Sequence, residues 1–223
     1  MKIATLNIQH GGGTRIKVIF DYMRTLDVDC FIVTEYRIND KGLSKLLHGI
    51  GFSYQLSCKV DSKTNTVLIA SKVPFTPLEA SQRIVSVDFG NLILVGVYFP
   101  QGEEKRPVFE ELQVFSKLDN VVLIGDFNTG RHYLDEKGKT FACTDCFESL
   151  EQQGFIDAWR IRNPAVLEFS WYSSQGNGFR IDHVFCATKF NNKISDIWYD
   201  SKPRLMKITD HSALIFQFQL ESI

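Results

Sequence analysis

Polar side chains that could do chemistry follow several apolar runs of the sequence. Val121 to Asn128 is the clearest case, because four aliphatic residues end at Gly125 and are followed by Asp126, Phe127 and Asn128. An apolar run closed by glycine predicts a buried strand whose end brings a carboxylate and a carboxamide out of the core. Such groups could move a proton and orient a reactant. The alternative is a simple turn, since Asp and Asn side chains bond local backbone at strand ends.

The same pattern recurs along the whole chain. Polar residues lie at or beside the ends of other predicted strands: Asn7, Glu35, Tyr98, Asp182, Asp210 and His211. With Asp126 and Asn128 they form a set of carboxylates, amides, one phenol and one imidazole. Metal-assisted phosphoester hydrolysis requires such a set, because hard oxygen ligands hold Mg²⁺ or Mn²⁺, a base activates water, and polar donors stabilise the phosphate oxygens. This mechanism needs no serine or cysteine nucleophile.

Hydrophobic patterns predict the strands that must position these residues. Apolar or alternating runs predict strands at 3–7, 30–33, 54–58, 67–70, 83–89, 92–98, 121–128, 169–172, 181–187, 194–198 and 213–220. The turn at Gly90 and Asn91 marks the clearest hairpin. Residues 129–140 are expected to form a polar loop.

Helical spacing predicts a smaller number of helices. Thr14 could cap a helix with apolar positions 16, 19, 20 and 23, and Pro107 could start one with apolar positions 109, 112, 115 and 118. Short helices are expected at 43–47 and 147–153, each followed by glycine. Strands outnumber helices, and hairpins mix with helical crossovers. Two packed sheets with helices outside therefore fit better than a doubly wound parallel sheet.

Composition limits the class of protein. With 223 residues, 44% hydrophobic and 23% charged, the chain is expected to fold as one globular domain, residues 1–223. The net charge of -1 gives no global attraction to nucleic acid, so binding to a phosphate backbone would need a local basic patch. An odd number of cysteines, no leader-like start and no membrane-length apolar run predict a cytoplasmic protein without membrane contact.

Two of the five cysteines suggest a further site. Cys143 and Cys146 have the spacing of half a zinc site or of a redox pair, and His132 lies upstream. No second pair follows, so this pattern by itself is weak evidence for metal binding.

Six short motifs, in order along the chain, resemble those of the endonuclease/exonuclease/phosphatase superfamily. They are Asn7-Ile8-Gln9, Glu35-Tyr36-Arg37, Tyr98-Phe99-Pro100-Gln101-Gly102, Gly125-Asp126-Phe127-Asn128, Arg180-Ile181-Asp182 and Thr209-Asp210-His211. The segments 98–102, 154–160 and 169–171 are most similar to the exonuclease III type of apurinic/apyrimidinic (AP) endonuclease. The resemblance implies a four-layered α/β sandwich, in which two mixed β-sheets pack face to face with helices on both outer faces. The site is then expected where the sheets meet at one edge.

The resemblance also implies a role for each candidate. Glu35 is similar to the principal metal ligand, with Asn7 and Asp210 close to the metal. Asp126 resembles the residue that handles the proton of the attacking water or the leaving oxygen, and Asn128 resembles the amide that orients it.

Two further residues are implied to act on the phosphate, and a third is implied to act through one of them. Tyr98 and His211 resemble its hydrogen-bond donors. Asp182 resembles the carboxylate that pairs with His211 and favours its protonated form. The alternative for Asp182 is a surface ion pair with Arg180 on a strand.

Four residues are implied to touch substrate. Arg37 and Gln101 occupy positions next to a nucleic-acid backbone, whereas Trp171 and Phe179 could form the wall of a pocket for a base-free sugar. Each of these aromatic residues could instead belong to the core.

The function implied by the resemblance is a Mg²⁺-dependent or Mn²⁺-dependent phosphodiesterase that acts on DNA, as an AP endonuclease or 3′-exonuclease. A monomer with DNA as its partner is expected. Gln9 stands where many relatives carry an acidic or amide residue near the metal, and the loops that grip DNA are short, which leaves specificity for abasic sites open. A phosphatase or phosphodiesterase for lipid, inositol or small nucleotide phosphates remains an alternative. A nucleic-acid-binding module with a degenerate site is another, although Glu35 and Asp126 argue against it.

Overall fold

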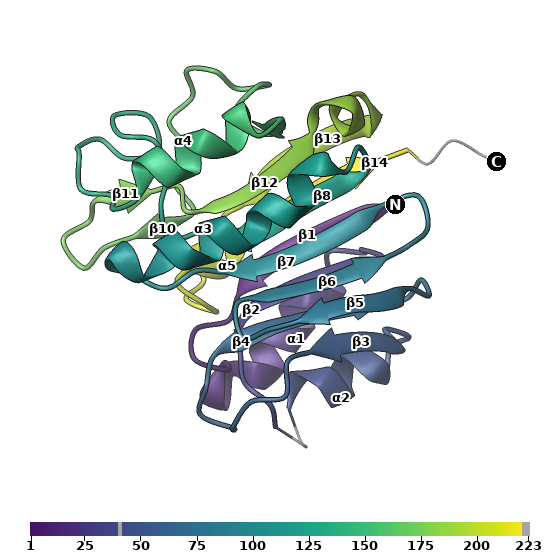
Figure 1. Cartoon of the computed structure of the whole chain (residues 1–223). Helices are drawn as coiled ribbons and strands as arrows, with labels where there is room; N and C mark the ends of the chain where they lie inside the picture. The colour runs from purple at the N-terminus through teal and green to yellow at the C-terminus, as the bar shows by residue number, and fades with distance from the viewer. Residues whose placement is uncertain (40–41, 220–223) are drawn as a thin grey trace.

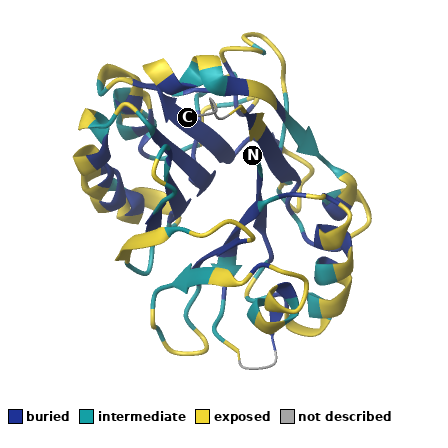
Figure 2. Cartoon of the chain, turned by 90° about the vertical axis from the view of Figure 1, so that its right-hand side faces the viewer, coloured by how far each residue is buried: buried dark blue, intermediate teal, exposed yellow. Residues whose placement is uncertain are grey.

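Two mixed six-stranded β-sheets, packed face to face, form the centre of the molecule in the computed structural model, which describes residues 1–39 and 42–219. Figure 2 shows their buried strands in dark blue between helices at the left and right, and the same arrangement can be followed in Figure 1. The four-layered α/β sandwich expected from the sequence is therefore confirmed.

Each sheet contains one parallel pair of neighbouring strands. The first sheet has the order β13-β14-β1-β2-β4-β3, with β1 (Lys2–Asn7), β2 (Cys30–Tyr36), β3 (Tyr54–Ser57), β4 (Thr66–Ser71), β13 (Ile194–Asp200) and β14 (Ala213–Phe218). The second has the order β5-β6-β7-β8-β12-β9, with β5 (Thr76–Ala80), β6 (Ile84–Asp88), β7 (Ile93–Tyr98), β8 (Val121–Asp126), β9 (Phe155–Asp157) and β12 (Asp182–Ala187). The parallel pairs are β1 with β2 and β7 with β8. A small hairpin joins β10 (Trp171–Tyr172) to β11 (Gly178–Phe179).

Helices cover the outer face of each sheet. Helices α1 (Ile16–Arg24) and α2 (Leu43–His48) pack on the first sheet, and α3 (Arg106–Leu112) and α4 (Thr144–Gln152) pack on the second. The remaining helical segments are α5 (Lys202–Leu205), η1 (Gly13–Arg15), η2 (Gly102–Lys105), η3 (Gln113–Lys117) and η4 (Thr188–Lys193). No helix of the described residues is long and apolar enough to cross a membrane.

The fully apolar strands are explained by burial on both faces. In β2, Cys30 and Ile32 point into the core between the sheets, whereas Phe31 and Val33 point toward α1 and α2. Side chains alternate between the two faces of a strand, so a strand that is covered on both sides must be apolar throughout. The same holds for β8, which carries the site motif at its end.

Some local predictions were wrong. Thr14 does not cap α1: it lies inside η1, and neither segment has a side-chain cap. The strand expected at 169–172 is formed only by β10, and the prediction that β14 reaches Leu220 falls outside the described residues. Strands β5, β9 and β11 and helix α5 were not predicted, because they are short and their patterns are broken by polar residues or proline.

Candidate active site

The predicted residues meet at one edge of the sheet pair. Asn7, Glu35, Tyr98 and Asp126 lie at or near the C-terminal ends of β1, β2, β7 and β8, which belong to the two parallel pairs. Asp182 opens β12 directly opposite Asp126. Glu35, Tyr98 and Asp126 border a cavity of about 490 Å³, here called the active-site cavity, and Asn7 and Asp182 contact residues of its lining. The lining also includes Gln101, Asn128, Trp171, Phe179, Asp210 and His211.

Gly125 allows β8 to lie close to β7 just before the carboxylate. Its φ is +145°, and a Cβ atom at this position would lie 2.0 Å from the carbonyl oxygen of Val97. Only glycine fits such an approach of two backbones. Asp126 is thereby held almost fully buried at the floor of the cavity.

Asn128 is fixed on every side by hydrogen bonds. Its backbone N–H donates to Asp126 Oδ1 at 2.9 Å, and its Nδ2 donates to the carbonyl of Phe99 at 2.7 Å. Gln101 Nε2 donates to Asn128 Oδ1, and Lys105 Nζ donates to the Asn128 carbonyl, each at 2.5 Å. Asn128 adopts a left-handed backbone with φ 51°, which is uncommon outside glycine and is stabilised by these contacts.

Asp182 and His211 form a buried pair, with His211 Nδ1 2.8 Å from Asp182 Oδ2. Burial lowers the pKa of His211, but the carboxylates of Asp182, Asp126 and Asp210 outweigh it and raise that pKa to about 10. His211 is therefore an imidazolium at neutral pH. It places a positive charge beside the cavity, as expected for a group that binds phosphate.

Asp126 has a carboxyl group with a raised pKa. Burial is the main cause, the negative charge of Asp182 adds to it, and the pKa reaches about 7. A carboxyl group that titrates near neutral pH can both accept and deliver a proton. This is the property required of a group that handles the proton of an attacking water.

Glu35 enters the site through an irregularity of β2. The pairing of β2 with β4 shifts between Val33 and Tyr36, and Glu35 has a φ of 52°. Such a bulge redirects a side chain. Glu35 Oε1 accepts from Asn7 Nδ2 at 3.1 Å, and Oε2 accepts from His10 N at 2.7 Å.

Asn7 connects two carboxylates. Its Nδ2 also donates to Asp126 Oδ2 at 2.9 Å, and its Oδ1 accepts the backbone N–H of Gln9 at 2.8 Å. The amide nitrogen of Asn7 therefore faces Glu35 and Asp126. In this orientation Asn7 positions the candidate metal ligand and the candidate base relative to each other.

Asp210 lines the same cavity and contacts an aromatic residue. Its Oδ2 accepts from Trp171 Nε1 at 3.1 Å and from Gln9 Nε2 at 3.2 Å. The ring centroids of Trp171 and Phe179 are 5.7 Å apart, and the ring of Phe179 also contacts that of Phe141. The two aromatic residues predicted to wall a pocket thus line the active-site cavity rather than the core.

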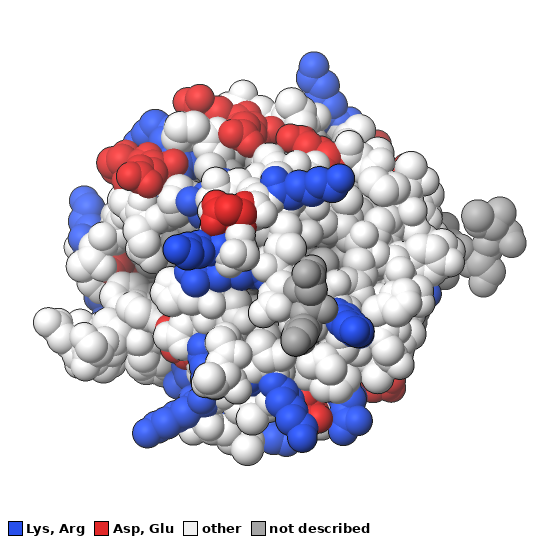
Figure 3. Space-filling view, turned by 90° about the horizontal axis from the view of Figure 1, so that it is seen from below, with Lys and Arg blue, Asp and Glu red and all other residues white. Residues whose placement is uncertain are grey.

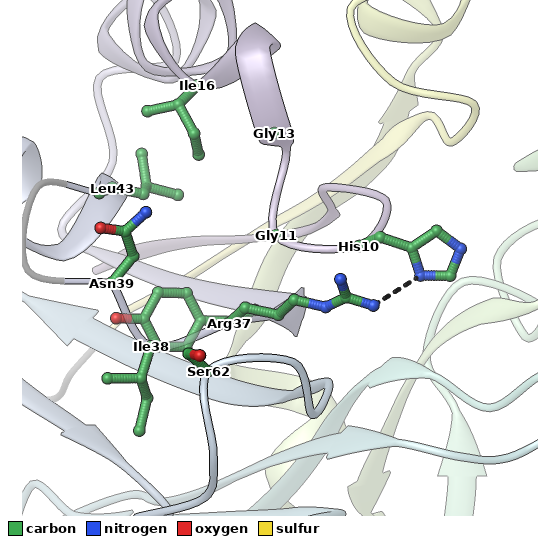
Figure 4. A pocket seen from close by; sticks show the side chains of 11 residues that line it. His10, Gly11, Gly13, Ile16, Arg37, Ile38, Asn39, Leu43 and Ser62 are labelled. Carbon is green, nitrogen blue, oxygen red and sulfur yellow. Dashed lines mark hydrogen bonds between the residues drawn. The ribbon is translucent and has the colours of Figure 1, made fainter.

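Arg37 lies beside the active-site cavity instead of lining it. It borders a neighbouring cavity of about 560 Å³, shown in Figure 4, in which the guanidinium extends toward His10. Its Nε donates to Asn65 Oδ1 at 2.6 Å.

Tyr98 has a pKa raised by burial and by the charge of Glu35, so its hydroxyl keeps its proton and can donate.

Three residues of the site were missed by the sequence interpretation. His10 directly follows the first motif and has its Nδ1 3.0 Å from Glu35 Oε2. Asn65, in the turn before β4, donates to Glu35 Oε2 at 3.1 Å and to the Tyr98 hydroxyl at 3.4 Å. Lys105 is buried in a charged stretch, and burial lowers its pKa. The sequence carries no separate signal for Asn65 or Lys105, because polar turns and charged stretches are usually solvated.

The donor chemistry around Glu35 fits a divalent cation. Its carboxylate is 15% exposed, borders the same cavity as Asp210, and contacts only N–H groups and His10 among the described residues. Carboxylate oxygens at a partly open cavity are the ligands that Mg²⁺ or Mn²⁺ takes. Asp126, Asp182 and His211 also lie within 4.8 Å of one another. That group is a poorer cation site, because the protonated His211 has no lone pair to give.

Arg180 is fully buried and does not form a surface pair with Asp182. It bonds Asp135 at 2.7 Å through Nε and Asp157 at 2.5 Å through Nη2. The surface-pair alternative is therefore wrong, because Asp182 pairs with His211 instead. The Arg180 pairs tie the loop before α4 to β9 and to the start of β12.

Among the residues that the structure describes, Cys143 and Cys146 have no partners that would complete a metal site. Cys143 contacts Glu103 at 3.2 Å, whereas Cys146 contacts Arg106 at 2.8 Å. Within residues 1–39 and 42–219, neither cysteine belongs to a group of three His, Cys, Asp or Glu ligands. All five cysteines are free thiols.

A known family combines this fold with this site. The model of the Endonuclease/Exonuclease/phosphatase family matches residues 4–211, so the chain belongs to that family. Membership, together with the site, defines the class of the protein as an enzyme that hydrolyses phosphate esters. Among curated proteins, exodeoxyribonuclease III of Haemophilus influenzae is 26% identical over 199 residues, covering 71% of this chain and 74% of that protein.

Solved structures show the same fold over nearly the whole chain. A variant of the 3′ phosphatase NExo from Neisseria, bound to a product DNA hairpin, has a TM-score of 0.83 at 20% identity and covers 99% of this chain and 100% of its own. An AP endonuclease from Archaeoglobus fulgidus has a TM-score of 0.83 at 22% identity with the same coverage. The 3′-5′ exonuclease NExo from Neisseria meningitidis has a TM-score of 0.84 at 19% identity, also covering 99% and 100% of the two chains.

Proposed function

We propose that this protein is a divalent-metal-dependent phosphodiesterase that acts on DNA, as a repair-type AP endonuclease or 3′-exonuclease. Residues 1–223 form one catalytic domain in this proposal, and the enzyme acts as a monomer in the cytoplasm. The observation that carries the proposal is the convergence of Glu35, Asp126, Asn128 and the Asp182–His211 pair on one cavity. The likeness to exodeoxyribonuclease III supports DNA as the substrate.

Asp126 handles the proton in this mechanism. Its pKa of about 7 leaves a large fraction ionised at neutral pH, so the carboxylate accepts a proton from the attacking water. Asn128 orients that water or the phosphate, since Phe99, Gln101 and Asp126 hold its amide in one orientation. Asn7 keeps Asp126 at a fixed place relative to Glu35.

Hydrogen-bond donors around the cavity stabilise the negative charge that develops on the phosphate oxygens. His211 supplies an imidazolium kept protonated by Asp182, and Tyr98 supplies a hydroxyl. Lys105 borders the same cavity and adds a positive charge near Asn128. Donors that are fixed before the reaction stabilise the transition state without a cost of reorganisation.

Glu35, with Asp210 in the lining of the same cavity, would hold Mg²⁺ or Mn²⁺, and Asn7 would position Glu35 through its Nδ2. The ion would neutralise phosphate charge and polarise the reacting phosphoryl group. The fit rests on the oxygen donors of Glu35 and Asp210, which line the same cavity, and on the partial exposure of Glu35.

Trp171 and Phe179 give the cavity an apolar wall against which a sugar can pack. In this proposal, the DNA backbone is contacted by Gln101, which lines the active-site cavity, and by Arg37, which lines the neighbouring cavity. On the face seen in Figure 3, Lys and Arg side chains are scattered and acidic side chains lie between some of them. The overall charge of -1 likewise predicts weak binding to long DNA that lacks a reactive site.

A substrate panel tests the proposal against its alternatives. Turnover with Mg²⁺ is measured on duplex DNA carrying an abasic site or a 3′-phosphate, on inositol phosphates, on a phospholipid headgroup and on small nucleotides. We expect hydrolysis of at least one DNA substrate to exceed that of every small phosphate. Faster hydrolysis of a small phosphate would show that this phosphate, and not DNA, is the substrate. DNA binding in EDTA without hydrolysis under any condition would indicate a binding module.

A further inference from the structure

The short helix α5 carries two exposed apolar side chains near the candidate active site. Leu205 is 71% exposed and Met206 is 61% exposed, and the two are here called the α5 tip. Asp210, which lines the active-site cavity, follows Met206 by four residues. An extended chain spans at most about 3.5 Å per residue, so the Cα atoms of Met206 and Asp210 are at most about 14 Å apart. Base pairs are about 3.4 Å apart along a strand, so the α5 tip lies within about four base pairs of DNA bound in the cavity.

The α5 tip has a well-defined backbone. Lys207 has a left-handed φ of 56°, and its N–H donates to the Arg204 carbonyl at 3.0 Å. The N–H of Ile208 donates to the Pro203 carbonyl at 2.8 Å. These two bonds form the Schellman motif that ends a helix. Because Pro203 and Ile208 are buried, the exposed tip stands on a packed base.

Helix α5 also contacts the strands that carry the site. The Cζ atom of Arg204 lies 4.4 Å from the ring centroid of Tyr172, and Arg204 Nε donates to Ser212 Oγ at 3.3 Å. Tyr172 follows Trp171 in β10, and Ser212 follows His211. Trp171 and His211 both line the active-site cavity. These contacts hold the α5 tip in a fixed position relative to the cavity.

Positive charge surrounds the α5 tip. Residues 201–207 contain two lysines, one arginine and no acidic residue, and both lysines are exposed. The preceding Asp200 accepts hydrogen bonds from the Tyr22 hydroxyl and from the Lys202 backbone N–H, each at 2.9 Å. Because the whole chain has a net charge of -1, binding to a phosphate backbone requires a local basic patch of this kind.

Apolar side chains flanked by cations have the chemistry of a DNA wedge. Proteins that kink a duplex insert Leu, Met and similar side chains between base steps, while Lys and Arg contact phosphates. The turn of the β10–β11 hairpin offers no such side chain, because residues 173–177 are Ser-Ser-Gln-Gly-Asn. Protein interfaces are depleted in lysine, so the two lysines beside the tip favour DNA over a protein partner.

We propose that the α5 tip inserts between base pairs of duplex DNA close to the reacting phosphate, while Lys202 and Lys207 contact the DNA backbone. The inference rests on the proposed function and adds to it the form of the substrate, a duplex that is opened locally. Unstacking costs least where a base is damaged or missing. The wedge therefore makes the enzyme prefer a duplex with an abasic site over an intact duplex.

The fluorescence of 2-aminopurine tests insertion by the full chain. This base analogue, placed near an abasic site in a duplex, becomes brighter when it is unstacked, and EDTA prevents metal-dependent cleavage during the measurement. The test variant is the double substitution Leu205→Gln/Met206→Gln. The control is Val114→Gln, which changes a residue that is 66% exposed in η3, before the start of β8 and thus at the opposite end of this strand from Asp126.

We expect the parent and Val114→Gln to raise the fluorescence equally and to bind the duplex with the same affinity. The double variant should lose the rise in fluorescence. It should also bind the duplex about tenfold more weakly, because its polar side chains gain little from burial between bases.

Salt dependence separates the wedge from the phosphate contacts. Loss of one phosphate contact reduces the slope of log K against log salt concentration by about 0.9. We expect this reduction in Lys202→Gln, whereas the double variant should keep the slope of the parent because it loses no charge. An unchanged slope in Lys202→Gln would overturn the proposed contact of this lysine with the backbone.

The outcomes distinguish this inference from the proposed function. Equal fluorescence in the parent and the double variant, or no rise in the parent, would overturn the wedge even if the protein cleaves DNA. Self-association of the parent in sedimentation, lost in the double variant without a change in DNA binding, would assign the α5 tip to a second copy and also overturn the wedge. Failure of the parent to cleave any DNA with Mg²⁺ would instead overturn the proposed function.

Discussion

Asp126 has two neighbours that set its charge and its position. Asp182, opposite it on β12, raises its pKa in addition to burial, while Asn7 donates a hydrogen bond that holds the carboxylate in place. His211 balances the two acids with one positive charge. This arrangement keeps a proton acceptor and a phosphate-binding cation side by side without their forming a direct ion pair.

Removal of either group should reduce turnover with little change in fold. We expect Asp126→Asn or His211→Ala to lower kcat by at least about 10²-fold, the scale of losing an acid-base group or a charge stabiliser. Asp21→Asn, at an exposed position of α1, is the control and should behave like the parent. Steady-state kinetics on a cleaved DNA substrate measures the effect. Full activity in both site variants would show that the chemistry occurs elsewhere.

His183 makes the stability of the protein depend on pH. Burial, and then the charge of Arg180, lower its pKa below the ordinary value of 6.5. The folded protein keeps His183 neutral while the unfolded chain takes up a proton, so its contribution to stability falls as the pH drops below about 6.5. Urea unfolding between pH 7 and pH 5 measures this loss. Relative to His183→Gln, the free energy of unfolding should fall by at most about 1.4 kcal/mol for each pH unit.

Glutamine is the suitable replacement because it keeps a donor for the Thr129 carbonyl, which accepts from His183 Nε2 at 2.8 Å. The stability of His183→Gln should vary less with pH over the same range. Parallel curves for the two proteins would mean that His183 does not titrate differently in the folded and unfolded states.

At the scale of elements, the approach of β7 and β8 determines where Asp126 lies. Gly125→Ala would push a Cβ atom against the Val97 carbonyl, so we expect it to lower the free energy of unfolding by roughly 3 kcal/mol. Gly138→Ala is the matched control, since a Cβ there meets nothing within 4 Å and should be tolerated. Chemical denaturation measures both. Equal stabilities for the two variants would contradict the close approach of the strands.

The buried Arg180 network holds the loop before α4 against the second sheet. Arg180→Met leaves Asp135 with Arg160 and Asp157 with the more distant Arg131, and the loss of the buried guanidinium should cost about 3–5 kcal/mol of unfolding free energy. Arg24→Met removes an exposed ion pair with Asp21 and a cation–π contact with the ring of Phe20, and it should leave stability almost unchanged. Denaturation of both variants tests the difference. A small loss in Arg180→Met would show that Arg160 and Arg131 are sufficient partners for the two aspartates.

For the whole molecule, the architecture could be predicted because central strands such as β2, β7 and β8 carry apolar runs that only a doubly covered sheet can bury. The residues at strand ends, such as Tyr98 and Asp126, were found because polar groups follow apolar runs there and because their motifs resemble those of a known family. Contacts that depend on backbone irregularity could not be predicted. The bulge that turns Glu35 into the site and the left-handed segment that places His10 beside it have no periodic pattern. Asn65 reaches Glu35 from a distant turn, which no local rule anticipates.

The most direct test of the central claim is cleavage of DNA as a function of metal. Abasic, nicked and intact duplexes are incubated with the protein in Mg²⁺ or in EDTA, with Asp126→Asn in parallel. We predict Mg²⁺-dependent cleavage of at least one duplex, which is lost in EDTA and reduced at least about 10²-fold in Asp126→Asn. Absence of metal-dependent cleavage on all three duplexes would contradict the assignment of this cavity to DNA phosphodiester hydrolysis.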